Sequence, residues 1–123
     1  MAIKTQTEAV REFEKHMTSR NWEGAVQAGE ELVDRLSAEG VELDPRTHYA
    51  LHNNLGIAYW LSGKEDAVHD PDSGRVVDYH SIAHLRRAVE IAEKNGLRDL
   101  AAKTEELLGQ HIGQYILVAE LVR

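Results

Sequence analysis

Histidine and aspartate side chains, which bind metal ions and transfer protons, gather in the stretch HDPDSGRVVDYHSIAH, residues 69–84. This stretch holds three of the seven histidines of the chain together with three aspartates. Imidazole and carboxylate groups at such density can form a metal site or supply acid and base catalysts. The alternative is a surface connection between two elements, in which the same polar residues form a turn and contact water.

Two histidine pairs have the spacing H-x-x-x-H. The first is His48 with His52, and the second is His80 with His84. Each pair places two imidazoles on one face of a helix, where they can bind one metal ion. We expect the pairs to lie apart, because in an antiparallel helical hairpin the second pair would face residues 57–61. A rise of about 1.5 Å per residue then separates the two pairs by roughly 13 Å.

A third ligand for the second pair can come from His69 or Asp78, so metal binding stays open as an alternative. Surface histidines without a metal are commoner, and the H-x-x-x-H motif alone has low specificity. A calcium loop is excluded, because Gly74 falls one place early and Ser81 stands where a bidentate glutamate is needed. We therefore predict no metal site and no cofactor.

No motif for nucleophilic catalysis accompanies these residues. Ser73 and Ser81 have histidines nearby in sequence, but neither follows a strand-turn-helix elbow or a glycine-rich oxyanion loop. The chain has no cysteine, which excludes a thiol nucleophile and a thiolate metal site. Paired carboxylates such as Glu30 with Glu31 indicate solvated helix faces. We predict no catalytic residues and no enzymatic activity.

Length and composition indicate a single globular domain over residues 1–123. The chain is 42% hydrophobic and 28% charged, as is typical of folded proteins. Its net charge of −7 disfavours binding to phosphate backbones, so we expect no nucleic-acid partner. No apolar run approaches the roughly 18 residues needed to span a bilayer, and the first residues do not resemble a signal peptide. We expect a cytoplasmic protein with no membrane partner.

Apolar residues recur at helical spacing along most of the chain and predict an all-α fold. Asn21 and Asp44 are helix N-cap residues, and Pro45 occupies the first helical position, where its missing N–H costs nothing. Asn95 and Gly96 favour the left-handed conformation that closes a helix. These signals predict about five helices, at roughly 7–19, 22–40, 44–63, 79–94 and 99 to the end.

The stretch between the third and fourth helices interrupts this pattern. DPDSG, residues 70–74, combines a proline pre-set for a turn, aspartates that bond to nearby backbone and a glycine that permits positive φ. Apolar residues flank it on both sides, so we predict a small β-hairpin inserted at about 66–78. Two short strands are marginal alone in water, and the hairpin must therefore pack on the helices.

A helical repeat is indicated by residues 54–59, NLGIAY, followed by Gly63. Leucine, a small residue and an aromatic have the spacing found in the first helix of a tetratricopeptide repeat. The matching second helix has small, large and small residues at Ser81, Leu85 and Ala88. NWEGA, residues 21–25, is similar to the turn between the two helices of such a repeat and indicates an earlier unit. The chain resembles this family over most of residues 7–112, with the hairpin inserted in the turn of the second unit.

The resemblance implies antiparallel helical hairpins whose first helices line a groove for an extended peptide or a partner helix. Carried over position by position, the groove residues are Ala50, Asn53, Ile57 and Trp60. Asn53 would hold a ligand backbone, and Trp60 offers the large contact area common at binding hot spots. The alternative is that Trp60 packs under the hairpin and the protein itself fills the groove.

The carboxyl-terminal stretch YILVAELV, residues 115–122, is apolar on more than one face of its predicted helix. The last helix of a repeat array normally presents a polar side to water, and fewer than about three repeats are marginal alone. We predict a homodimer through this helix. The contacts would come from Ile112, Tyr115, Ile116, Ala119 and Val122. The alternative is an internal cap over the first helix, and Gly109 and Gly113 would allow close helix approach in either case.

These patterns together predict a non-enzymatic interaction module with a protein or peptide partner, which also self-associates. The alternative is a protein that binds a metal ion or a small molecule through His80, His84 and the inserted hairpin. The first hypothesis places function in the groove, and the second places it at the start of the fourth helix.

Overall fold

The computed structural model of the protein describes residues 5–63 and 66–121, with side chains as far as residue 113. Within these residues the chain forms five helices and one two-stranded antiparallel hairpin. The helices are α1 (Gln6–Thr18), α2 (Trp22–Glu39), α3 (Pro45–Leu61), α4 (His80–Lys94) and α5 (Arg98–Leu121). The strands are β1 (Ala67–His69) and β2 (Val76–Tyr79). The predicted all-α fold with an inserted hairpin is confirmed.

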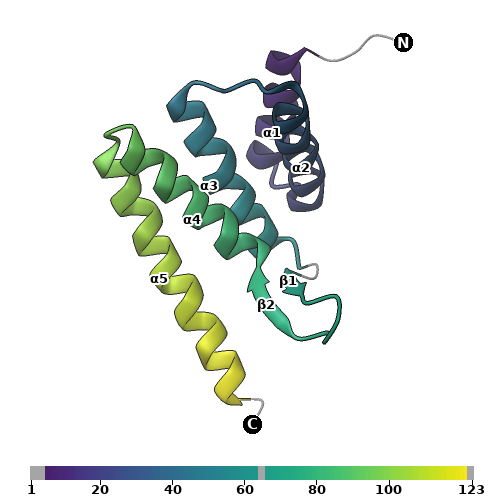
Figure 1. Cartoon of the computed structure of the whole chain (residues 1–123), viewed down its shortest axis with the longest axis vertical. Helices are drawn as coiled ribbons and strands as arrows, with labels where there is room; N and C mark the ends of the chain where they lie inside the picture. Colours follow the sequence, from purple (N-terminus) through teal and green to yellow (C-terminus); the bar gives the residue numbers. More distant parts are fainter. Residues whose placement is uncertain (1–4, 64–65, 122–123) are drawn as a thin grey trace.

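Consecutive helices lie side by side, and each packs on the next (Figure 1). Short turns reverse the chain after α1, α2 and α4, whereas the hairpin makes the connection from α3 to α4. The largest contact between elements joins α3 and α4. These two helices therefore form the centre of the fold, with the α1–α2 pair on one side and α5 on the other.

Helix boundaries follow the capping residues that the sequence indicates. The Asn21 side chain accepts a hydrogen bond from Gly24 N at 3.2 Å, and Asp44 accepts one from Thr47 N at 3.4 Å. Gly40 closes α2 with a φ of 63°, a left-handed conformation that costs glycine little. The predicted helix ends that fall within the described residues agree with the structure to within about two residues.

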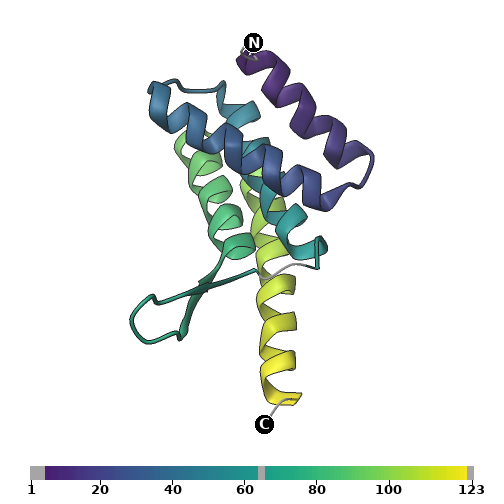
Figure 2. The ribbon, with the colours of Figure 1, turned by 90° about the vertical axis from the view of Figure 1, so that its right-hand side faces the viewer.

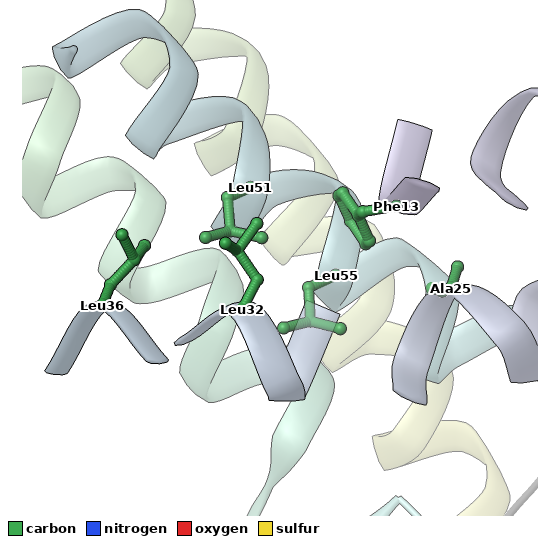
Figure 3. Close-up of a cluster of buried hydrophobic side chains, with 7 residues drawn as sticks. Phe13, Ala25, Leu32, Leu36, Leu51 and Leu55 are labelled. Carbon is green, nitrogen blue, oxygen red and sulfur yellow. The ribbon is translucent and has the colours of Figure 1, made fainter. Parts of the chain in front are cut away.

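Two clusters of buried side chains form the core. The first lies between α1, α2 and α3 and contains apolar residues that recur at helical spacing (Figure 3). Its members are Phe13, Ala25, Leu32, Leu36, Leu51, Leu55 and Ala58. The second lies between α3, α4 and α5, and its members are Tyr49, Ala88, Ile91, Ala92 and Ala101. Helix α3 contributes to both clusters and so joins the two halves of the molecule.

Helices α3 and α4 approach closely at Gly56. A methyl group there would lie 2.8 Å from the backbone oxygen of Ser81 and 2.8 Å from Leu85 Cγ, nearer than such atoms pack. Ser81, Leu85 and Ala88 are all buried. The small, large and small residues of the sequence pattern therefore mark the buried side of α4.

The hairpin runs from Ala67 opposite Tyr79 to His69 opposite Val76, with a bulge between the two pairs. Val77, which has no partner in the register of the two strands, is 64% exposed. Figure 2 shows the hairpin projecting away from the helices, while β2 continues directly into α4. The predicted hairpin is confirmed, and its second strand ends at Tyr79.

Helix α5 extends past the helices on which it packs. Its last turns reach beyond the ends of α3 and α4 in both views (Figures 1 and 2). A methyl group at Gly109 or Gly113 would meet no atom within 4 Å, so neither glycine is a point of close helix approach within the described residues. None of the helices described in the structure is long and apolar enough to cross a membrane.

The Gly56→Ala variant is expected to lower the free energy of unfolding by about 1–3 kcal/mol, because α3 and α4 must move apart to admit the methyl group. Gly109→Ala is the matched control, since it lies in open space on α5 and gains up to about 1 kcal/mol of helix propensity. Urea unfolding followed by circular dichroism measures both. Equal stability of the two variants would contradict the close approach at Gly56.

Candidate functional site

A cleft of about 360 Å³ lies between α3 and α5. It is lined by Tyr49, Asn53, Lys103, Glu106, Leu107 and Gln110. Of the four residues predicted to line a groove, Asn53 lines this cleft. The lining mixes one base, one acid and two amides with an aromatic ring and a leucine, so it offers contacts to both polar and apolar groups.

A chain of hydrogen bonds forms the floor of this cleft. Thr104 Oγ1 donates to Asn53 Oδ1 at 2.8 Å and lies 2.6 Å from the Tyr49 hydroxyl, which is also 3.1 Å from the Leu100 carbonyl oxygen. Asn53 Nδ2 donates to Asn54 Oδ1 at 3.2 Å. The amide oxygen of Asn53 therefore serves the contact between α3 and α5, and binding of a ligand backbone by this residue stays a prediction.

The other three predicted groove residues lie elsewhere on α3. Ala50 lines a narrow hollow between α1 and α3, and Ile57 is half-buried. Trp60 stacks on His111 of α5, with ring centroids 4.3 Å apart and an interplanar angle of 26°. Trp60 thus contacts α5. The sequence predicted for it either an open groove or a position under the hairpin, and not this contact.

Asp66, Ser81 and His111 form a buried polar network between the hairpin, α4 and α5. Asp66 Oδ1 accepts from Ser81 N at 2.8 Å, and Asp66 Oδ2 accepts from the Ser81 hydroxyl. The same hydroxyl oxygen lies 2.5 Å from His111 Nε2. Ser81 and His111 are 0% exposed, and Asp66 is 9% exposed. Because the Ser81 proton goes to Asp66, the His111 Nε2–H donates to Ser81.

This network caps α4 and is unlike a nucleophilic triad. Tyr79, the N-cap residue, makes no side-chain capping bond. The Asp66 carboxylate, 15 residues before Ser81, caps the helix instead by accepting from Ser81 N. The Asp66 carbonyl oxygen also accepts from His80 N at 2.9 Å. In a triad the histidine bridges serine and carboxylate, whereas here the serine hydroxyl stands between them and is fully buried. The arrangement joins three elements.

The two histidine pairs meet, and the predicted separation of roughly 13 Å is wrong for one residue of each. His52 Nδ1 lies 3.0 Å from His84 Nδ1, and the two rings stack with centroids 5.2 Å apart. His84 also stacks on Tyr59 at 5.7 Å, as its expected position opposite residues 57–61 requires. The prediction counted the backbone rise along α3 but left out the reach of the side chains, which allows His84 to contact residues two turns apart.

Glu30 of α2 completes the histidine chain. Its Oε1 lies 2.8 Å from His84 Nε2, so a carboxylate and two imidazoles follow one another from α2 through α4 to α3. His48 extends the row, with its ring centroid 5.1 Å from that of His52. Glu30 was predicted to belong to a solvated face; its side chain is 36% exposed, and its carboxylate also contacts His84 of α4.

Burial and hydrogen bonding shift the pKa values along this chain. Burial, and then the charge of His84, lower the pKa of His52 to about 3. The hydrogen bond from His84 lowers the pKa of Glu30 and outweighs the desolvation of that carboxyl group. Burial also lowers the pKa of His48. The site therefore holds an ionised carboxylate, and His52, which is 7% exposed, is neutral around pH 7.

A third metal ligand from the hairpin was the condition for a metal site at His80 and His84. In the structure His69 Nδ1 lies 3.1 Å from the Gly74 carbonyl oxygen, and Asp78 pairs with Arg86 at 3.6 Å. His80 stacks on Tyr59 at 4.8 Å, whereas His84 turns to His52. Among residues 5–63 and 66–113, no three histidine, aspartate or glutamate side chains converge to hold a metal ion.

Comparison of the chain with protein-family models, with curated proteins and with solved structures gives no match. The tetratricopeptide resemblance therefore depends on the residues quoted for it. Functional inference depends on the α3–α5 cleft and on the histidine chain.

Acid is expected to destabilise the protein through His52. In the unfolded chain this imidazole takes up a proton near its ordinary pKa of about 6.5, whereas in the folded protein its pKa is about 3. The free energy of unfolding should therefore fall as the pH decreases from about 6.5 toward 3, by at most about 1.4 kcal/mol for each pH unit. Urea unfolding at a series of pH values measures the slope.

His52→Gln should flatten this slope, with a remainder because burial also lowers the pKa of His48 and of His111. His69→Gln, at an exposed hairpin position, is the matched control and should keep the wild-type slope. A slope unchanged in His52→Gln would show that this residue takes up its proton equally in both states.

Proposed function

We propose that the chain is a non-enzymatic interaction module of the tetratricopeptide kind, which binds a segment of a partner protein in the cleft between α3 and α5. The observation that carries the proposal is the cleft itself, about 360 Å³ in volume and lined by six residues of two neighbouring helices. Of the four residues that the family resemblance assigns to a groove, Asn53 is the one that lines this cleft.

A preformed cleft favours binding, because little conformational entropy is lost when a ligand enters it. The hydrogen bonds among Tyr49, Asn53 and Thr104 hold α3 and α5 at a set spacing. Lys103 and Glu106 are exposed and can bind groups of either charge, while Leu107 supplies apolar surface. An extended peptide with both polar and apolar side chains matches this lining. A cytoplasmic location, and the exclusion of nucleic acid and membrane as partners, remain predictions from composition.

Exchange of the two cleft charges tests the proposal. Lys103→Glu with Glu106→Lys keeps the net charge and reverses the charge pattern in the cleft, so binding of the partner should weaken at least about tenfold. Glu93→Lys with Lys94→Glu makes the same exchange at exposed positions on α4 and should bind like the wild type. Affinity capture followed by mass spectrometry, with partner recovery compared among the three proteins, makes the measurement. Equal recovery with both double variants would exclude the cleft as the binding surface.

Self-association through α5 is the second part of the proposal. Ile112 is 36% exposed on this helix, and the last turns of α5 reach past α3 and α4 (Figure 2). Tyr115, Ile116 and Ala119 follow along the same helix, but their side chains lie outside the described residues. Val122 lies outside them altogether. A two-fold contact between two such helix ends would cover the apolar stretch.

Ile112→Asp is expected to weaken the dimer, because a carboxylate at a two-fold apolar contact is desolvated beside its symmetry mate. Val77→Asp, which places the same charge on an exposed hairpin valine, is the control and should leave the dimer intact. Sedimentation equilibrium or light scattering measures the mass over a concentration series. A wild-type protein that is monomeric at high micromolar concentration would contradict self-association.

A further inference from the structure

A second cleft, of about 280 Å³, lies between α2, α3 and α4 and is separate from the cleft between α3 and α5. One wall is apolar and includes Val33, Leu36 and Leu51. The other part carries His48, His52 and Arg87. Ligand sites typically combine such an apolar wall with a few polar groups that orient the ligand.

The charge of this cleft differs from that of the chain as a whole. The protein carries a net charge of −7, yet no aspartate or glutamate is among the residues that line the cleft. Arg87 Nη1 lies 3.1 Å from Glu90, and its guanidinium group has further N–H donors. An anionic group is therefore favoured over a cation. A single cation beside an apolar wall suits a carboxylate with a carbon chain better than a phosphate.

We propose that this cleft binds a small organic acid with an apolar body. Its carboxylate meets His48, His52 and Arg87, and its carbon chain lies on the apolar wall.

The charge of the ligand tests the proposal. Hexanoate is a suitable probe, and hexanamide is its uncharged match. In methyl NMR of the full chain, hexanoate should shift the signals of Val33, Leu36 and Leu51, and hexanamide should shift them much less. Calorimetry should show hexanoate binding about tenfold more tightly than hexanamide. Equal binding of the two probes, or shifts confined to other residues, would overturn the proposal.

Substitutions test the carboxylate contact. Arg87→Gln should weaken hexanoate binding about tenfold, because it removes the cation of the cleft. His80→Gln is the control, since His80 stacks on Tyr59 and does not line the cleft, and it should bind hexanoate like the wild type. Unchanged binding in Arg87→Gln would overturn the proposal.

The site is independent of the cleft between α3 and α5. Exchange of Lys103 and Glu106 should leave hexanoate binding unchanged, so failure of the α3–α5 cleft as a partner site would not affect this result.

Discussion

The close contact of α3 with α4 at Gly56 is the constraint on which the rest of the structure depends. Because glycine has no side chain, the Ser81 backbone and the Leu85 side chain of α4 can reach the α3 backbone there. This contact fixes the register of the two helices. One turn before Gly56 it places His52 beside His84, and about one turn after Gly56 it places Tyr59 beside His80. Both clefts use α3, so their shapes depend on the same register.

The polar groups buried around α4 add specificity to this packing. On one side the Asp66, Ser81 and His111 network joins the hairpin, α4 and α5, and on the other side Glu30, His84 and His52 join α2, α4 and α3. Helices α2, α3 and α5 thus each make a polar contact with α4. Hydrogen-bond networks of this kind disfavour other packing arrangements, since a shifted register would separate their members.

The sequence predicts the elements of this fold well and the contacts between them poorly. Asn21, Asp44 with Pro45, and the DPDSG turn act within a few residues of themselves, so helix ends and the hairpin can be inferred without knowledge of the tertiary structure. Glu30 has no local signal that separates it from its neighbour Glu31, and only the packing of α2 on the α3–α4 pair gives it a partner. Among the predicted groove residues, Asn53 faces a cleft, whereas Trp60 is stacked on a histidine that lies 51 positions further along the chain. Pairings across such distances depend on helix register and side-chain reach, which periodicity does not determine.

The Asp66 carboxylate gives the hairpin a role beyond that of a connection. Asp66 lies just before β1, and it caps α4 only because β1 and β2 fold back on each other and return the chain to its side. A related chain that lost the hairpin by deletion would also lose the cap of its central helix and a partner of Ser81 and His111. Gain or loss of the insertion during evolution would therefore require simultaneous changes in α4 and α5. By contrast, a methyl group added at Gly74, in the tip of the hairpin, would meet no atom within 4 Å, so the packing of the helices does not constrain the size of this residue.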